Sequence, residues 1–273
     1  MDWKESLALG KATDYVSTYT PSLLQAVPRQ YNREHLGISA NNLPFKGHDL
    51  WHGYEVSWLN NKGKPQVALL KLTVPCDTPN IVESKSFKLY LNSLNQSRFG
   101  SVEQVSECIA ADIQQVVGGA VTVILGPVHD TRWQSYPNID GCCLDGLDIE
   151  VDAYQYEPGL LKRGVEKVSE VLYSHLFKSN CLVTHQPDWA TVVIDYQGTE
   201  IDHESLLRYL ISYRMHNEFH EQCVERIYSD IMQRLKPEYL MVQALFTRRG
   251  GLDICPVRAS ALDFSPMSRQ IRQ

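Results

Sequence analysis

Alternating apolar and polar positions predict a β-hairpin in the N-terminal half of the chain. Tyr54–Leu59 alternates, a polar turn containing Gly63 follows, and Gln66–Thr73 forms a second extended run. Side chains along a strand point to opposite faces in turn, and a short glycine-containing connection is typical of hairpins. Ala120–Val128 begins as a further β-branched strand, and residues 1–40, rich in turn formers, are expected to form an extended arm.

Apolar residues at helical spacing predict two helices in each half of the chain. The four expected helices are Ser84–Leu94, Val102–Val117, Ser205–Tyr213 and Glu221–Leu235. In the second half a hairpin-like pair is expected from Leu147–Tyr156 and Ala190–Tyr196, and a strand from Leu240–Thr247. Each half therefore follows the order strands, two helices, strands.

The two halves also align with each other, which indicates an internal duplication. Ser86, Tyr90, Leu91 and Ser93 match Ser205, Tyr209, Leu210 and Ser212 at a constant offset, and Ile109, Asp112 and Ile113 match Ile227, Asp230 and Ile231. Shared helical periodicity could account for part of this similarity. Upstream of the helices, the segment from Asn42 to Asp49 has the same length as the segment from Cys181 to Asp188. Both end in Asp, but only the second begins with a thiol.

Composition restricts the class of protein. The chain has 273 residues, of which 43% are hydrophobic and 21% charged, as in a globular protein of one large or two ordinary domains. The net charge is -6 and the pI is about 5.8. Such a surface repels a phosphate backbone, so no nucleic-acid partner is expected.

Cysteine usage and hydropathy predict the compartment. The seven cysteines are odd in number and contain no pair with zinc-ribbon spacing, which favours a reducing environment. The N-terminus lacks a basic segment followed by an apolar run. The longest apolar stretches, Val67–Leu70 and Ala120–Leu125, are much shorter than the roughly 20 residues of a membrane helix. We therefore expect a cytoplasmic protein without membrane contact.

Cys181 is the first candidate for chemistry. His185 and Asp188 follow it closely, within a turn that is expected to lie near the surface. A thiolate nucleophile needs partial exposure and a positive or hydrogen-bonding environment. Because free cysteine is also among the most buried residue types, a purely structural role stays open at this point.

Two further segments suggest binding chemistry without proving it. His216 and His220, expected at the start of the last long helix, are spaced to share one helical face, as in half of a zinc site. No third ligand is evident, and polar residues that cap a helix are the alternative. Arg248 and Arg249 precede Gly250 in a segment that could hold a phosphate. The chain lacks the GxGxxG pattern, so the residues alone do not predict a nicotinamide cofactor.

Four segments together resemble the long form of the QueF family, the 7-cyano-7-deazaguanine reductases of queuosine biosynthesis. They are the signature Glu83–Tyr90, the nucleophile segment Ser179–Trp189, and the substrate and cofactor segments Phe219–Cys223 and Thr247–Gly251. The resemblance runs over nearly the whole chain, and every position that the family uses for chemistry matches.

The resemblance implies an α+β tunnelling fold (T-fold), with a tandem duplicated antiparallel sheet and two helices packed on one face of each half. Residues 1–145 are then the N-terminal half, with the arm and the signature, and residues 146–273 the C-terminal half, with the catalytic cysteine. Such units pair through their sheets, so a homo-oligomer, in its simplest form a dimer, is expected.

The resemblance also implies an activity, the reduction of a 7-deazapurine nitrile to its aminomethyl form by two NADPH through a covalent thioimide on cysteine. The implied catalytic residues are Cys181, Asp188 and His220. The implied substrate-binding residues are Val82, Glu83, Ser84, His220 and Glu221. The implied cofactor-binding residues are Ser84, Lys85, Arg249 and Gly250, and no metal is implied. The alternatives are a zinc-dependent pterin or purine hydrolase of the same fold, with His216, His220 and Cys181 as ligands, and a non-catalytic purine-binding protein.

Overall fold

The computed structural model describes residues 15–130, 136–267 and 269–273, which divide into two compact units. The first unit comprises Met1–Leu43, His48–Ser135 and Arg248–Ile254, and the second comprises Pro44–Gly47, Tyr136–Thr247 and Cys255–Gln273. The predicted division of roles between residues 1–145 and 146–273 stays a prediction.

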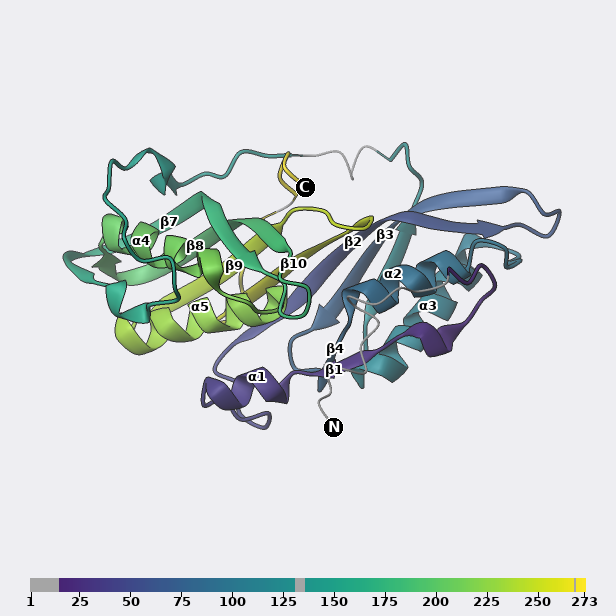
Figure 1. The fold of residues 1–273 in the computed structure, drawn as a ribbon, viewed down its shortest axis with the longest axis horizontal. Helices are drawn as coiled ribbons and strands as arrows, with labels where there is room; N and C mark the ends of the chain where they lie inside the picture. Colours follow the sequence, from purple (N-terminus) through teal and green to yellow (C-terminus); the bar gives the residue numbers. More distant parts are fainter. Residues whose placement is uncertain (1–14, 131–135, 268) are drawn as a thin grey trace. The chain divides into compact units, whose positions relative to one another are not determined.

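The first unit contains an antiparallel sheet with two helices on one of its faces (Figure 1). In chain order its elements are η2 (Pro21–Leu23), β1 (Ala26–Pro28), α1 (Gln30–His35), β2 (Lys46–Leu59), β3 (Pro65–Pro75), β4 (Asn80–Val82), α2 (Ser84–Ser93), α3 (Val102–Val117) and β5 (Thr122–Gly126). Strand β3 pairs antiparallel with both β2 and β5, and β1 pairs with β4. The predicted hairpin, both helices and the β5 strand are confirmed, whereas the arm also contains the short helix α1.

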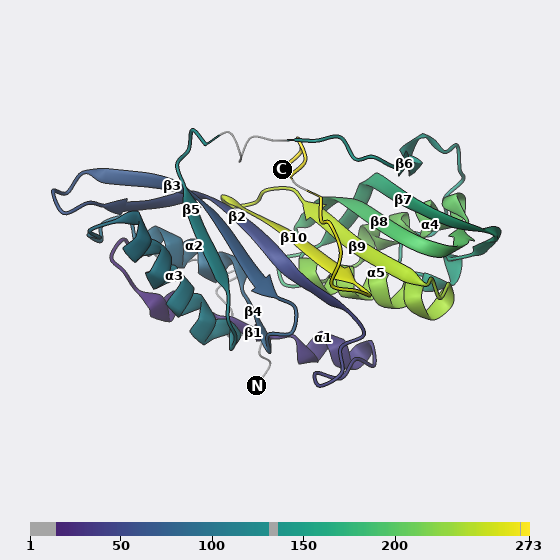
Figure 2. The same cartoon turned by 180° about the vertical axis from the view of Figure 1, so that it is seen from behind.

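Period-two burial along the strands builds the core of this unit. On β3 the alternate residues Ala68, Leu70 and Leu72 are buried against α2 and α3. Their neighbours point to the opposite face of the sheet, which Figure 2 presents to the viewer. On that face Val67 is 61% exposed, and Ile124 of β5 is 49% exposed. Two apolar side chains are therefore exposed on this face.

The second unit repeats the arrangement of strands and two helices. Its elements are β6 (Cys142–Cys143), η4 (Leu144–Gly146), η5 (Pro158–Leu160), β7 (Arg163–Asn180), β8 (Pro187–Ile201), α4 (His203–Ile211), η6 (Ser212–Met215), α5 (His220–Arg234), β9 (Tyr239–Phe246) and β10 (Leu252–Ala259). Strands β7, β8, β9 and β10 pair antiparallel in that order, and β6 pairs parallel with β7. Helices α4 and α5 lie on one face of these strands (Figure 1). The protein is therefore a mixed α+β fold.

The predicted pairing of Leu147–Tyr156 with Ala190–Tyr196 is wrong. Strand β8 pairs with β7, which the sequence did not predict, and Leu147–Tyr156 lies outside any strand. Its main-chain carbonyls instead accept hydrogen bonds from the α4–η6 region, at 3.1 Å from Arg208 Nε to the carbonyl oxygen of Glu150. The alternation of apolar residues in Leu147–Tyr156 indicates an extended segment with one face half-buried. Such a segment does not have to pair with a strand.

The two units share a helix-capping arrangement. The side chain of Glu83 accepts a hydrogen bond from the backbone of Ser86 at the start of α2, and that of Asp202 does the same for Ser205 at the start of α4. Both serine hydroxyls donate back to the carbonyl of the capping residue, at 2.7 and 2.8 Å. The predicted sequence match of the two serines therefore corresponds to matched contacts.

A buried tyrosine–aspartate bond is also repeated. Tyr90 of α2 donates to Asp112 of α3 at 2.6 Å, and Tyr209 of α4 donates to Asp230 of α5 at 2.5 Å. Each bond links the two helices of its unit. Helical periodicity alone does not produce such a specific polar pair, so these contacts support the internal duplication.

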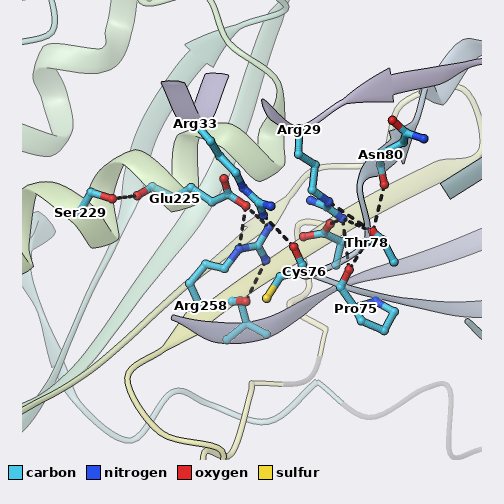
Figure 3. Close-up of polar contacts among 11 residues, drawn as sticks. Arg29, Arg33, Pro75, Cys76, Thr78, Asn80, Glu225, Ser229 and Arg258 are labelled. Carbon is cyan, nitrogen blue, oxygen red and sulfur yellow. Dashed lines mark hydrogen bonds and ion pairs between the residues drawn. The ribbon is translucent and has the colours of Figure 1, made fainter. Parts of the chain in front are cut away.

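Each unit also buries an arginine–carboxylate pair that Figure 3 shows. In the first, Arg29 at the start of α1 contacts Asp49 of β2 at 2.6 Å, and both side chains are at most 3% exposed. In the second, Arg258 of β10 contacts Glu225 of α5 at 2.8 Å. Removing one partner of such a pair leaves a buried charge uncompensated, so both pairs fix their elements firmly. The first attaches the N-terminal arm to the sheet.

Among the described residues, no helix has the length and apolar content required to cross a membrane.

Candidate active site

Cys181 lies directly after β7, in the turn that leads to β8. Asn180 and Pro187 are the last paired residues of the two strands. Within the turn, the Cys181 N–H donates to the carbonyl of Gln186 at 2.8 Å, and the His185 N–H donates to the carbonyl of Cys181 at 3.1 Å. His185 adopts φ = 56°, a left-handed conformation that non-glycine residues rarely take. The turn therefore holds the cysteine backbone firmly at the end of the hairpin.

The thiol itself is covered. Cys181 is 3% exposed, so the expected partial exposure of the nucleophile is wrong for this conformation. His185 and Gln186 of the same turn are exposed, which places the cysteine beneath a surface turn. Any reaction of this thiol with a bound molecule therefore requires local rearrangement of the turn.

Asp188 and His220 form a buried acid–imidazole pair in the same unit. Asp188, 5% exposed, lies on β8 opposite Ser179 of β7. His220 begins α5, and its Nε2 is 3.2 Å from Asp188 Oδ2. The imidazole stacks on the ring of Phe246, with centroids 3.8 Å apart and an interplanar angle of 6°. The pair is thus held in a geometry in which a proton can pass between carboxylate and imidazole.

The second nitrogen of His220 is available to a ligand. His220 Nδ1 is buried and has no hydrogen-bond partner among the described residues. Leaving a buried polar atom unsatisfied costs about 1–3 kcal/mol. A bound substrate that forms a hydrogen bond with Nδ1 would remove this cost.

In the first unit the residue aligned with Asp188 is used differently. That residue, Asp49, is engaged by Arg29 at 2.6 Å, whereas Asp188 lies 3.2 Å from the imidazole of His220. The fixed positive charge of Arg29 cannot transfer a proton. Of these two contacts, the one between Asp188 and His220 is thus the one suited to acid–base chemistry.

Glu218 forms a buried network beside this pair that the sequence did not predict. Its carboxylate is 2.6 Å from Arg226 Nη2 and 3.0 Å from His216 Nε2. Burial would raise the pKa of Glu218, but hydrogen bonds from His216 and Arg226 outweigh it and hold the pKa below its ordinary value. The segment is joined to β7 because the Glu218 N–H donates to the carbonyl of Asn180 at 3.0 Å. The network therefore fixes the approach to α5 next to Cys181.

The expected placement of His216 and His220 on one helical face is wrong. Helix α5 begins at His220, and His216 lies before it, at the end of η6. The two imidazoles contact different carboxylates, Glu218 for His216 and Asp188 for His220. Two histidines four residues apart share one face only when both lie in the same helix.

Glu221 and Cys223 follow His220 on α5. Glu221 is 3% exposed, consistent with a carboxylate kept away from bulk water. Cys223 is fully buried, and burial raises the pKa of its thiol well above the ordinary value. Cys223 is therefore packed as a structural thiol.

The signature segment of the first unit begins at a capped helix start. Glu83 accepts the N–H groups of Lys85 at 2.8 Å and of Ser86 at 2.7 Å, and it is 1% exposed. Burial raises the pKa of Glu83, and these two hydrogen bonds offset only part of the rise. Val82 is buried at the end of β4, whereas Ser84 and Lys85 are half-buried in the first turn of α2.

The turn Arg249–Leu252 lies against the same helix. Hydrogen bonds of 2.9 and 3.2 Å join the backbones of its two end residues, and Gly250 and Gly251 have φ of 62° and 79°. A Cβ on Gly250 would lie 3.2 Å from Lys88 Cδ of α2. Lys88 also faces a small pocket lined by both glycines, and its Nζ is 3.6 Å from Glu55 Oε2. Helical spacing in the sequence does not reveal this contact of Lys88, because the contact joins segments that are distant in the chain.

Comparison with known proteins identifies the family. A family model described as nitrile reductase, 7-cyano-7-deazaguanine-reductase N-term, matches residues 15–125, and one described as QueF-like protein matches residues 187–262. A protein of Colwellia psychrerythraea, named NADPH-dependent 7-cyano-7-deazaguanine reductase, is 52% identical, covering 98% of this chain and 96% of its own. Proteins of the same name from Dechloromonas aromatica and Azoarcus sp. are 55% and 53% identical, covering 97% and 95% of this chain and 94% and 92% of their own.

The chain therefore belongs to the QueF family of 7-cyano-7-deazaguanine reductases. A solved structure of the archaeosine synthase QueF-Like in the apo form covers 37% of this chain and 99% of its own at 17% identity, with a TM-score of 0.31. That similarity is too low to establish a detailed fold.

Proposed function

We propose that this chain is an NADPH-dependent reductase that converts 7-cyano-7-deazaguanine to 7-aminomethyl-7-deazaguanine, in the biosynthesis of queuosine. The relatives that match over more than nine-tenths of the chain carry the name of that activity. The observation that carries the proposal is a cysteine at the end of β7, with the buried Asp188–His220 pair held by the next strand and helix.

Cys181 is the nucleophile in the proposed mechanism. A nitrile carbon is electrophilic but reacts poorly with hydride, and a covalent intermediate divides one difficult step into easier ones. Addition of the thiol across the C≡N bond forms a carbon–sulfur bond and an N–H bond, which gives a thioimide. When bound, NADPH supplies the hydrides, two for each nitrile that is reduced to an amine.

Asp188 is the proposed donor of the proton to the nitrile nitrogen. Its burial and its contact with His220 at 3.2 Å suit a carboxyl that passes a proton and regains it from the imidazole. His220 then assists the later proton transfers, including those that accompany the departure of sulfur. Phe246 stacks on the imidazole and so keeps its orientation fixed.

Glu83 and Glu221 are the proposed recognition groups for the base. The deazapurine edge presents a ring N–H and an exocyclic amine, and ionised carboxylates are acceptors only. Both carboxylates are at most 3% exposed, so their hydrogen bonds to a ligand would form away from competing water. Val82, Ser84 and the unsatisfied Nδ1 of His220 complete the proposed substrate contacts.

Ser84, Lys85, Arg249 and Gly250 are the proposed cofactor-binding residues. The residues fit a phosphorylated ligand, because α2 offers a helix N-terminus, which favours an anion, and the glycines of the Arg249–Leu252 turn allow close backbone approach. Lys88 adds a second ammonium group at this turn, where a Cβ on Gly250 would nearly touch its side chain.

Replacing Lys88 with glutamine is expected to raise the KM for NADPH about 10-fold or more, with little change in kcat. The reason is the loss of a charge-assisted hydrogen bond to phosphate, worth about 1.5–3 kcal/mol. Steady-state kinetics with NADPH as the varied substrate measure this effect. Lys62→Gln, in the exposed turn between β2 and β3, is the control. Equal KM values for the two variants would show that Lys88 does not bind the cofactor.

The finer architecture proposed is a tandem T-fold that assembles as a homo-oligomer, with a dimer as its simplest form. The repeated capping serines and tyrosine–aspartate bonds support the tandem duplication. The exposed Val67 and Ile124, on the sheet face opposite α2 and α3, support pairing of that face with a second copy.

The proposed activity is tested by following NADPH oxidation with 7-cyano-7-deazaguanine while quantifying the amine. Two NADPH consumed for each amine formed is the expected stoichiometry. Unchanged nitrile after prolonged incubation of the folded protein with NADPH would contradict the proposal. A ratio of one, with an aldehyde or imine as the end product, would contradict it as well.

A further inference from the structure

A cluster of metal-ligating side chains lies in the second unit, outside the residues assigned to nitrile reduction. Cys143, Asp145 and His175 each offer a donor atom, and these three atoms lie within 4.8 Å of one another. Cys143 is exposed, and Asp145 and His175 are half-buried, so an ion in solution can reach the cluster.

The local fold builds this cluster from two segments that are about thirty residues apart. Strand β6 pairs parallel with β7, which sets Cys143 beside Tyr173. Asp145 follows in η4, and its carboxylate accepts the hydroxyl of Ser174 at 2.7 Å and the N–H of His175 at 3.1 Å. The β7–β8 register shifts between Ser174 and Phe177, and such a bulge redirects the side chains that it contains.

The imidazole of His175 is already oriented by a second residue. Its Nδ1 is 2.8 Å from the hydroxyl of Thr191 on β8, which is 2% exposed. In metal sites the second ring nitrogen of a histidine ligand usually makes such a hydrogen bond, which fixes the tautomer and the ring orientation. Because this contact engages Nδ1, we assign Nε2 of His175 as the donor to a metal.

We propose that Cys143, Asp145 and His175 bind one Zn²⁺ ion, with water as the fourth ligand. One thiolate, one imidazole and one carboxylate form a donor set suited to zinc, whereas calcium and magnesium prefer oxygen donors alone. Tetrahedral zinc with bonds of about 2.0–2.3 Å places its ligand atoms about 3.6 Å apart, so the side chains close in slightly on binding. Cys143 loses its thiol proton to solvent as the zinc–sulfur bond forms.

Cys142 provides a matched control on the adjacent residue. Both cysteines of β6 are exposed and lie in the same strand. Because consecutive side chains of a strand point to opposite faces, Cys142 cannot join the same cluster. A surface thiol that binds metal nonspecifically would give similar behaviour at both positions, whereas the built site requires only Cys143.

The test titrates chelator-treated full-length protein with Zn²⁺ against a chromophoric zinc indicator, and separately with Co²⁺. Wild-type protein is expected to bind one equivalent and to show a thiolate-to-cobalt charge-transfer band. Cys143→Ser removes the band and weakens zinc binding at least about 10-fold, and His175→Gln also weakens it at least about 10-fold. Cys142→Ser and Cys181→Ala both retain the band and the affinity.

Three outcomes would overturn the proposal. They are the absence of a saturable zinc site in the wild type, equal loss of binding in Cys142→Ser and Cys143→Ser, and loss of the cobalt band in Cys181→Ala, which would place the metal on the catalytic thiol. Thermal unfolding of each metal-free variant identifies any that fails to fold. Cys143→Ser changes one atom of an exposed side chain, so it provides a folded test even if His175→Gln does not.

Discussion

Cys181→Ala is expected to lower the rate of NADPH oxidation with 7-cyano-7-deazaguanine by on the order of 10⁴-fold or more. Without the sulfur no thioimide forms, and hydride must attack the unactivated nitrile. The fold should persist, because the substitution removes a single atom from a cysteine held by its backbone hydrogen bonds in the β7–β8 turn. Steady-state rates of folded wild type and variant, compared at saturating NADPH and nitrile, measure the effect.

Cys142→Ser is the matched control, because it removes another thiol of the same unit from an exposed position. It should retain full activity. A Cys181→Ala variant that still turns over within about 10-fold of the wild type would show that the sulfur takes no part in the chemistry. A similar loss in Cys142→Ser would point to a general effect of cysteine replacement.

Glu218→Gln is expected to lower the free energy of unfolding by about 3–5 kcal/mol at pH 7, because Arg226 then loses the partner of a buried ion pair. The Glu218 carboxylate is 4% exposed, and its contacts with Arg226 and His216 hold its pKa below the ordinary value. A depressed pKa contributes stability above the unfolded-state value, near 4.3, that is lost as pH falls through the folded-state value. The difference between wild type and variant should therefore narrow in acid.

Urea unfolding of both proteins at pH 7, 5 and 3.5 tests this dependence. Glu204→Gln is the control, because Glu204 forms an i,i+4 pair with Arg208 at 3.0 Å and its side chain is 54% exposed. That substitution should cost less than about 1 kcal/mol at any pH. A Glu218→Gln variant as stable as the Glu204→Gln variant, or a difference that widens in acid, would contradict the account of the network.

The helices could be predicted from the sequence because their signals are local. Apolar residues at spacings of three and four gave α3, with Ser101 capping its start and Gly118 in the left-handed conformation at its end. Glu83 and Asp202 cap α2 and α4 in the same way. These signals involve only residues that are close in sequence. They can therefore be recognised without knowledge of the tertiary structure.

Strand β7 and the polar network could not be predicted, because their causes are distant in sequence. The first half of β7, from Arg163 to Glu170, carries mostly charged and polar residues and is stabilised by pairing with β8. The Glu218–Arg226 contact crosses from a loop to the side of α5, where no spacing rule applies. The burial of Cys181 could not be predicted either, because it depends on the conformation of the turn that covers the thiol.

The predicted site residues fall into two groups that the structure describes separately. Cys181, Asp188, His220 and Glu221 lie in the second unit, whereas Val82, Glu83, Ser84, Lys85, Arg249 and Gly250 lie in the first. Within each group, the sequence motifs named residues whose roles in the reaction stay predictions. They did not name Phe246, which stacks on His220, or Lys88, which lies against Gly250, because both contacts join separate elements.

Mass spectrometry of the intact protein incubated with 7-cyano-7-deazaguanine, in the absence of NADPH, tests the covalent step most directly. We expect a mass increase equal to that of the nitrile, located on the Cys181 peptide and absent from Cys181→Ala. An active preparation that forms no adduct at any nitrile concentration, or one modified on a different cysteine, would contradict the proposal that this covered sulfur opens the nitrile bond.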